Sequence, residues 1–160
     1  MKIAIFTEGT ILMHQGAVGH AREKIVQQVM DAKPSVKDYA NYVPIGDAAK
    51  KVRKWADQNV EIIYMTSRRK KKEIDEIQKV LDRNHFPAGT LEYRTENEEY
   101  KDAAERIMPD VLIEDDCESI GGEIEMTYPH ISPELKKKTK SMAVKEFSGI
   151  DHLPDNVAAF

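Results

Sequence analysis

The stretch that decides the fold is Ile3-Ala4-Ile5-Phe6-Thr7-Glu8-Gly9-Thr10-Ile11-Leu12, an apolar run that leads at once into a Glu-Gly-Thr turn. Its first part, roughly from Lys2 to Phe6, is typical of a strand that is buried on both faces of a parallel sheet. The turn brings polar side chains to the carboxyl end of that strand, which is where open parallel sheets bind ligands. The stretch therefore predicts an α/β domain with a polar site directly after its first strand.

The same pattern of an apolar run followed by polar residues recurs twice further along the chain. Val60-Glu61-Ile62-Ile63-Tyr64-Met65 ends in Thr66-Ser67-Arg68, and Val111-Leu112-Ile113 runs into Glu114-Asp115-Asp116. Between them, Lys101 lies near the start of a segment with helical periodicity. In order and spacing, these four segments resemble the four motifs of the haloacid dehalogenase (HAD) superfamily, and the resemblance spans residues 3 to 116.

The resemblance departs from the family at the residue that matters most for chemistry. In the family the first strand ends in Asp-x-Asp-Gly-Thr, where the first Asp attacks phosphorus and the second is the acid/base. Alignment on Gly9-Thr10 puts Phe6 at the nucleophile position and Glu8 at the acid/base position. Alignment on the strand end, with one residue deleted, puts Thr7 at the nucleophile position. An aspartyl-phosphate intermediate needs an attacking carboxylate, so we expect the ordinary HAD reaction to be lost or rerouted.

The resemblance also implies a set of ligand-binding residues. Phosphoryl transfer depends on hydrogen-bond donors and neutralising charge, and Mg2+ prefers hard oxygen ligands. The residues expected to bind phosphate are Gly9, Thr10, Thr66, Ser67 and Lys101. The residues expected to hold a weakly bound Mg2+ are Asp115, Asp116 and Glu8. Two neighbouring arginines, Arg68 and Arg69, are expected to add positive charge beside the site.

Each of these segments also has an explanation that involves no ligand. Thr66-Ser67 would cap the following helix, Lys101 would lie on a helix surface, and the acids after residue 113 would form a solvated loop. The basic run 68–72 stands at the start of a helix, where the macrodipole disfavours cations. That run is either a solvated helix face or an electrostatic funnel for a polyanionic ligand.

The bulk properties narrow the class of protein. A chain of 160 residues suits one domain with a sizeable core, and its formal charge of -4 argues against general binding to nucleic acid or membrane surfaces. Specific nucleic-acid binding is also disfavoured, because no aromatic residues are interleaved with the basic run. One cysteine, Cys117, fits a reducing compartment, and no signal segment or membrane span is recognisable. We therefore expect a cytoplasmic protein, with homo-oligomerisation left open.

Apolar runs alternate with segments of helical periodicity along the whole chain, which predicts layered α/β architecture. We expect residues 1–160 to form a single three-layer domain around a mostly parallel, HAD-like sheet of about five strands. Helices are expected at about 19–30 and after Asp47, and the last strand at 142–147. Residues 13–46 are the segment available for a minimal cap or flap, with Tyr39 and Tyr42 positioned to cover an opening.

Three functions follow from these observations. The first is a HAD-like protein without the aspartyl nucleophile, which binds a phosphorylated small molecule or phosphoprotein with little or no phosphatase activity. The second is a Mg2+-dependent phosphatase or hydrolase that uses Glu8 with Asp115 and Asp116 and forms no phosphoaspartate. The third is a module that binds a protein or polyanion through its basic run.

Overall fold

A computed structural model describes all 160 residues of the chain. The strands are β1 (Lys2–Phe6), β2 (Leu12–Met13), β3 (Val43–Pro44), β4 (Glu61–Met65), β5 (Thr90–Glu92), β6 (Val111–Asp115) and β7 (Lys140–Val144). The α-helices are α1 (Arg22–Met30), α2 (Ala48–Ala56), α3 (Lys71–Arg83), α4 (Tyr100–Ile107) and α5 (Pro133–Lys136). Short 3-10 helices are η1 (Gln15–Ala17), η2 (Pro34–Lys37), η3 (Tyr39–Asn41), η4 (Gly122–Glu125), η5 (Tyr128–His130) and η6 (Val157–Ala159).

Five of the strands form one parallel sheet in the order β5-β4-β1-β6-β7. The chain adds β4 and β5 on one side of β1 and then returns to add β6 and β7 on the other side. The strand order therefore reverses at β1, and a crevice is expected at the carboxyl ends of β4, β1 and β6. The predicted α/β domain with a parallel sheet of about five strands is confirmed.

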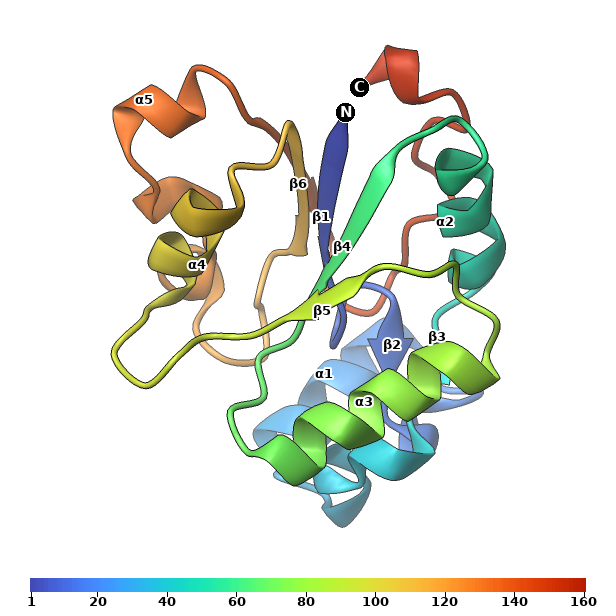
Figure 1. The fold of residues 1–160 in the computed structure, drawn as a ribbon. Coiled ribbons are helices and arrows are strands. Elements are labelled where there is room, and N and C mark those ends of the chain that lie inside the picture. Colours follow the sequence, from blue (N-terminus) through green and yellow to red (C-terminus); the bar gives the residue numbers. More distant parts are fainter.

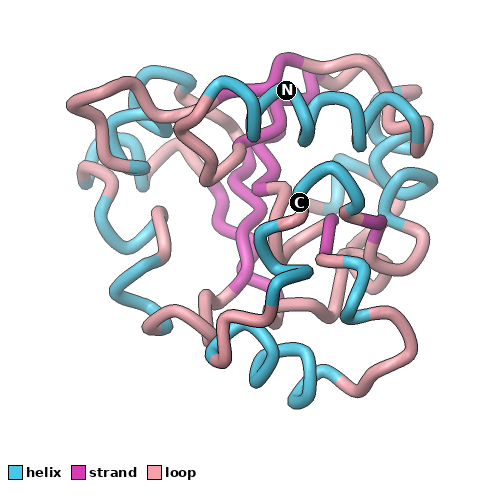
Figure 2. The backbone as a smooth tube through the Cα atoms, turned by 90° about the horizontal axis from the view of Figure 1, so that it is seen from below, coloured by secondary structure: helices cyan, strands magenta, loops and turns pink.

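Side chains that alternate along β1 divide the core into two layers. Ile3 and Ile5 face a large cluster that includes Trp55 of α2 and Ile77 of α3. Ala4 and Phe6 face a smaller cluster with residues of α4. Figure 1 shows α2 and α4 on opposite sides of the sheet, and Figure 2 shows the strands enclosed between helices. The expected three-layer arrangement follows from this alternation.

Element boundaries differ from the sequence-based expectation at several ends. The first helix begins at Arg22 rather than near residue 19, and the last strand covers Lys140–Val144 rather than 142–147. The larger difference is in β6, which continues through Glu114 and Asp115. These two side chains are only 3% and 5% exposed. They belong to a buried strand, so the alternative of a solvated acidic loop is wrong for both.

The C-terminal segment 148–160 packs against α2 rather than along the edge of the sheet. Trp55 Nε1 donates to the Pro154 carbonyl at 2.8 Å, and Ile150 and Leu153 are buried in the large cluster. Asp47 stands at the N-cap position of α2, but its side chain makes no capping bond. The carboxylate of Asp151 accepts from the Asp47 backbone N–H instead, at 3.0 and 3.1 Å.

Residues 13–46, the segment expected to form a cap or flap, are bounded by a small two-stranded ribbon of β2 and β3. β2 pairs antiparallel with β3, so Leu12 lies opposite Pro44 and Met13 opposite Val43. Figure 1 shows this ribbon and α1 beyond the end of β1, on the side where the strands finish. The helices of the chain include none that is long and apolar enough to cross a membrane.

Candidate functional site

A pocket of about 160 Å3 opens beyond the carboxyl ends of β1, β4 and β6, where the strand order reverses. A volume of this size exceeds that of a single water many times over. Its lining combines aromatic side chains with carboxylates and one arginine. The lining residues are Phe6, Glu8, Gly9, His14, Val29, Val36, Tyr39, Tyr42, Ser67, Arg68, Tyr100, Glu114, Asp115, Cys117, Ser119, Ile120, Glu125, Thr127, Glu146 and Phe147.

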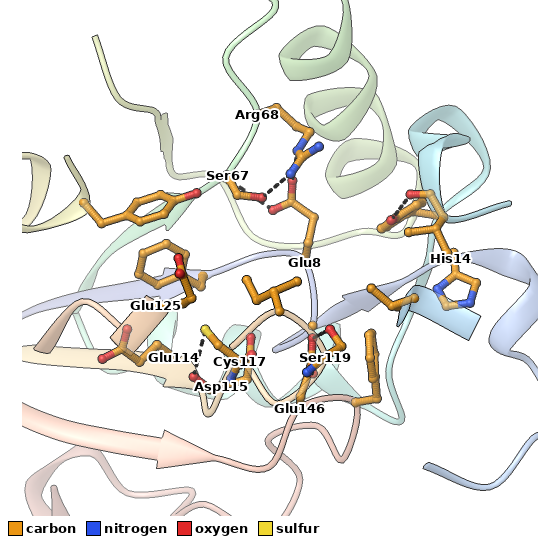
Figure 3. A pocket seen from close by; sticks show the side chains of 18 of the residues that line it. Glu8, His14, Ser67, Arg68, Glu114, Asp115, Cys117, Ser119, Glu125 and Glu146 are labelled. Carbon is orange, nitrogen blue, oxygen red and sulfur yellow. Dashed lines mark hydrogen bonds and ion pairs between the residues drawn. The ribbon is translucent and has the colours of Figure 1, made fainter. Parts of the chain in front are cut away.

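Glu8 points toward the end of β4, and its carboxylate is surrounded by donors. Thr66 Oγ donates to Oε1 at 2.7 Å, and the Ser67 backbone N–H donates to Oε2 at 3.3 Å. Thr7 Oγ lies 2.5 Å from the same Oε2. Figure 3 shows Glu8 directed at Ser67 and Arg68, with Asp115 and Glu146 on the opposite side of the pocket. The carboxylate thus takes the donors that the HAD resemblance assigns to phosphate.

Arg68 completes this arrangement around Glu8. Its Nε lies 3.2 Å from Glu8 Oε1, and its Nη2 donates to Ser67 Oγ at 2.8 Å. The guanidinium carbon stands 4.6 Å from the ring centre of Tyr39. Burial by itself would lower the pKa of Arg68, but the Glu8 carboxylate beside it leaves the pKa raised. Arg68 is therefore a fixed part of the pocket wall and not a mobile surface cation.

The two residues that stand at the nucleophile position, according to the alignment chosen, are both buried in the fold. Phe6 packs edge-to-face on Tyr100, with ring centres 5.3 Å apart. Thr7 is fully buried, and its hydroxyl also lies 3.1 Å from the Met65 carbonyl. Thr7 is not among the residues that line the pocket. An apolar ring thus faces the pocket at one of the two positions that the resemblance offers for the attacking carboxylate.

Asp115 lies against the Gly-Thr turn that follows β1. Its Oδ2 accepts from Thr10 Oγ at 2.8 Å and its Oδ1 from the Cys117 backbone N–H at 2.9 Å. Gly9 has φ +83°, and a Cβ there would approach Asp115 Oδ2 to 2.8 Å. The turn therefore needs glycine for its backbone and for this close approach. Burial raises the pKa of Asp115 above its ordinary value, because desolvation disfavours the ionised form.

Other carboxylates near the pocket tie loops to the strand ends. Glu114 accepts from the backbone N–H groups of Thr127 and Tyr128 at 2.7 and 2.8 Å. Glu146 accepts from the backbone N–H and the hydroxyl of Ser119, both at 2.7 Å. Burial raises the pKa of both carboxyls. These acids hold the loops around the opening through hydrogen bonds of the charge-assisted kind.

The residues expected to hold Mg2+ do not fit the ion. Asp116 faces away from Glu8: its Oδ1 accepts from the Glu146 backbone N–H at 3.0 Å, and its Oδ2 lies 3.1 Å from Lys145 Nζ. Glu8 is bound by donors at the end of β4, and Asp115 by donors on the other side of the pocket. No three His, Cys, Asp or Glu side chains are grouped to hold a metal. Separate hydrogen bonds hold Asp115, Asp116 and Glu8, and the structure does not group these three carboxylates around one ion.

The expected phosphate-binding residues are only partly brought together. Thr66 and Ser67 meet at Glu8, whereas Thr10 is fully buried and bonded to Asp115. The Gly9 N–H donates to the Leu12 carbonyl within its own turn. Lys101 does not line this pocket. It faces a neighbouring one, where its Nζ lies 3.1 Å from Glu99 Oε2.

The basic run 68–72 divides into two parts. Arg68 and Arg69 precede α3; Arg68 is half-buried in the pocket wall, whereas Arg69 is exposed and donates to the carbonyls of Thr95, Glu96 and Glu98. The lysines that follow are exposed, and two of them pair with acids one turn along α3. Thr66-Ser67 does not cap that helix, because α3 begins at Lys71 and its N-cap residue is Lys70.

Sequence reasoning missed three features of this region. Glu146 was detectable as a carboxylate just after the last strand, by the same rule that identified Asp115. Tyr100 was assigned to a helix, without its contact with Phe6. Arg94, which lies over the Tyr100 ring with its guanidinium carbon 3.8 Å from the ring centre, carries no sequence signal beyond following a short strand.

Comparison with known proteins identifies the fold. No protein-family model and no curated protein sequence matches the chain. Among solved structures, the class C acid phosphatase from Bacillus anthracis with tungstate bound is similar with a TM-score of 0.57 and 14% identity, over 92% of this chain and 68% of that one. D,D-heptose 1,7-bisphosphate phosphatase from Burkholderia thailandensis gives a TM-score of 0.49 and 9% identity, over 92% and 93%.

A HAD family hydrolase from Deinococcus radiodurans, with bound phosphate and sodium, gives a TM-score of 0.47 and 8% identity, over 92% of this chain and 91% of that one. At such identities the likeness concerns the fold alone. The match to the class C acid phosphatase shows that the two chains share a fold.

Proposed function

We propose that this protein binds a phosphorylated ligand on a HAD-like scaffold and carries out little or no phosphatase chemistry. The observation that carries the proposal is the environment of Glu8. Its carboxylate accepts from Thr66 and Ser67 and pairs with Arg68, so a protein anion occupies the donors that would hold a substrate phosphate. At the same end of the sheet, Phe6 lines the pocket and Thr7 is buried, so neither residue that the resemblance offers for the nucleophile position supplies a carboxylate.

The ligand class is inferred from the fold and from the supply of cations near the opening. The acid phosphatase with the same fold binds tungstate, an analogue of phosphate. In this chain Arg68 lines the pocket, and Arg94 and Lys101 line the neighbouring one. A phosphorylated small molecule and a phosphoprotein would both supply the required anionic group. The pocket also has aromatic walls, which would suit a ligand whose phosphate is attached to an apolar moiety; these walls are formed by Tyr39, Tyr42 and Tyr100.

The two alternative functions make different demands on the same residues. Metal-dependent hydrolysis would require Glu8 to leave Arg68 and converge with Asp115 and Asp116, which the hydrogen bonds of all three oppose. A polyanion-binding module would rest on the exposed lysines at the start of α3, because Arg68 lies in the pocket wall and Arg69 donates to backbone carbonyls. Neither alternative has a specific contact in its favour.

The test is a turnover assay joined to a binding assay on the full chain. Phenyl phosphate and inorganic phosphate are titrated by calorimetry, and phenyl phosphate hydrolysis is followed with added Mg2+. We expect measurable binding with hydrolysis near background. Robust hydrolysis that disappears in Glu8→Gln would refute the proposal and support the metal-dependent enzyme. Failure of both probes to bind would also refute it.

A further inference from the structure

Arg94 stands out among the arginines because nothing in the protein accepts its hydrogen bonds. Its Nε is buried and has no hydrogen-bond partner; Arg68 Nε also lacks one, but it has the Glu8 carboxylate 3.2 Å away, whereas Arg94 has no ion pair. Its guanidinium stacks over the ring of Tyr100, with the guanidinium carbon 3.8 Å from the ring centre. Every other arginine has an acidic partner or donates to a backbone carbonyl; these are Arg22, Arg53, Arg68, Arg69, Arg83 and Arg106.

Charged groups of both signs lie near Arg94. Burial lowers the pKa of Arg94 most, the charges of Arg69 and Arg68 lower it further, and Tyr100 and Glu125 raise it. A buried donor that lacks an acceptor costs free energy, and the cost is larger for a charged group. An anion beside Arg94 would remove this cost. Stacking on Tyr100 uses only the face of the guanidinium, so the in-plane N–H groups are left for an oxyanion.

Arg94 lines a second pocket of about 340 Å3 together with Lys101 and His130. Lys101 pairs there with Glu99, whose side chain is 72% exposed, and exposed pairs of this kind are weak. Lys101 can therefore turn to an incoming anion at little cost. Tyr100 and Glu125 line both pockets, so the two cavities are neighbours.

We propose that the phosphate of the ligand binds in this second pocket, on Arg94 and Lys101, and not at the end of β4. The inference rests on the proposed function and specifies where its anionic group lies. Glu8 already fills the donors at Thr66 and Ser67, whereas Arg94 is a cation without an acceptor. The apolar part of the ligand then extends past Tyr100 into the strand-end pocket.

The test compares variants of the full chain in calorimetric titrations with inorganic phosphate and with phenyl phosphate. Arg94→Gln should weaken binding of both probes about tenfold or more, the loss of one charge-assisted bidentate contact. Lys101→Ala should weaken it a few-fold. Lys79→Gln removes one positive charge at an exposed position of α3 outside both pockets, should leave phosphate affinity unchanged, and is the matched control.

Stability provides an independent readout for the same variant. Arg94→Gln loses the stacking on Tyr100 but also removes a buried donor that has no acceptor, so its Tm should stay within a few degrees of that of the parent. Unchanged phosphate affinity in Arg94→Gln, or an equal loss in Lys79→Gln, would overturn the inference and leave the proposed function standing. A parent protein that binds neither probe would overturn both. Phosphate binding accompanied by rapid hydrolysis would refute only the proposed lack of turnover.

Discussion

Glu8→Gln is the perturbation for which the structure gives the clearest magnitude. The amide keeps the shape of the carboxylate but removes its charge and replaces one oxygen by an N–H2 group. At Oε1 that group would meet Arg68 Nε, and at Oε2 it would meet the Ser67 N–H. In either orientation, the amide N–H2 group of the new glutamine would face a hydrogen-bond donor, Arg68 Nε or the Ser67 N–H. The side chains of Glu8 and Arg68 are only 13% and 27% exposed, so water can replace few of the lost interactions.

A hydrogen bond to a charged group contributes about 1.5–3 kcal/mol, and a donor left unsatisfied adds a further cost. We expect Glu8→Gln to lose about 3 kcal/mol of unfolding free energy. For a chain of this size, this corresponds to a fall of roughly 6–12 °C in Tm. Urea unfolding and a thermal scan, both followed by circular dichroism, measure the two quantities. Glu123→Gln, at an exposed residue, is the control and should change Tm by less than about 2 °C. Equal stability of the two variants would refute the arrangement described around Glu8.

Three further predictions concern the rest of the site and the core. Burial raises the pKa of Asp115, so its ionised form costs stability above that pKa, and the cost disappears as pH falls through it. Asp115→Asn should thus gain stability relative to the parent at neutral pH and lose that advantage on acidification, as urea unfolding across a pH series would reveal. Gly9→Ala should cost at least about 1 kcal/mol more than Gly19→Ala, because both have positive φ but only Gly9 faces Asp115 at 2.8 Å; equal losses in denaturant melts would contradict the close approach. Leu153→Ala should cost about 2–5 kcal/mol in the same melts, while Val18→Ala at an exposed position should be nearly neutral; a neutral Leu153→Ala would mean that the C-terminal segment lies outside the core.

The sequence predicted the fold well because the parallel strands are apolar on both faces. The run from Lys2 to Phe6 is β1 with the expected bounds, and the apolar stripe of Ala48, Val52 and Trp55 is fully buried on α2. Boundaries were less certain where polar residues continue a strand. Glu114 extends β6 because backbone donors of Thr127 and Tyr128 satisfy its carboxylate, and those donors come from a distant loop.

The site was predictable in location but not in the direction of its side chains. Glu8 and Asp115 do lie at neighbouring strand ends, as their positions after apolar runs indicated. Which donors each carboxylate meets depends on tertiary contacts, and these turn Glu8 toward Arg68 and Asp115 toward Thr10. The sequence pattern does not show which hydrogen-bond donors compete for each carboxylate, so it could not predict that Glu8 and Asp115 point to different partners.

Lys101 is a second residue whose position could be predicted from the sequence but whose side-chain direction could not. Its place near the start of α4 was predicted, but the direction of its side chain depends on Glu99 and on the pocket that Arg94 forms above Tyr100. Arg94 itself follows a strand of three residues and has no neighbouring motif. Its importance lies in the absence of an acceptor, which only the packed structure reveals.

The central claim is that no covalent phosphoryl-enzyme forms. The resemblance puts Phe6 or Thr7, and no carboxylate, at the nucleophile position, and Thr66, Ser67 and Arg68 hold Glu8. The most direct measurement is intact-protein mass spectrometry after incubation with acetyl phosphate and Mg2+, with rapid acid quenching. The account predicts a single mass, that of the unmodified chain, at every time point. A stoichiometric phosphoryl adduct that hydroxylamine removes, and that is absent from Glu8→Gln, would contradict it.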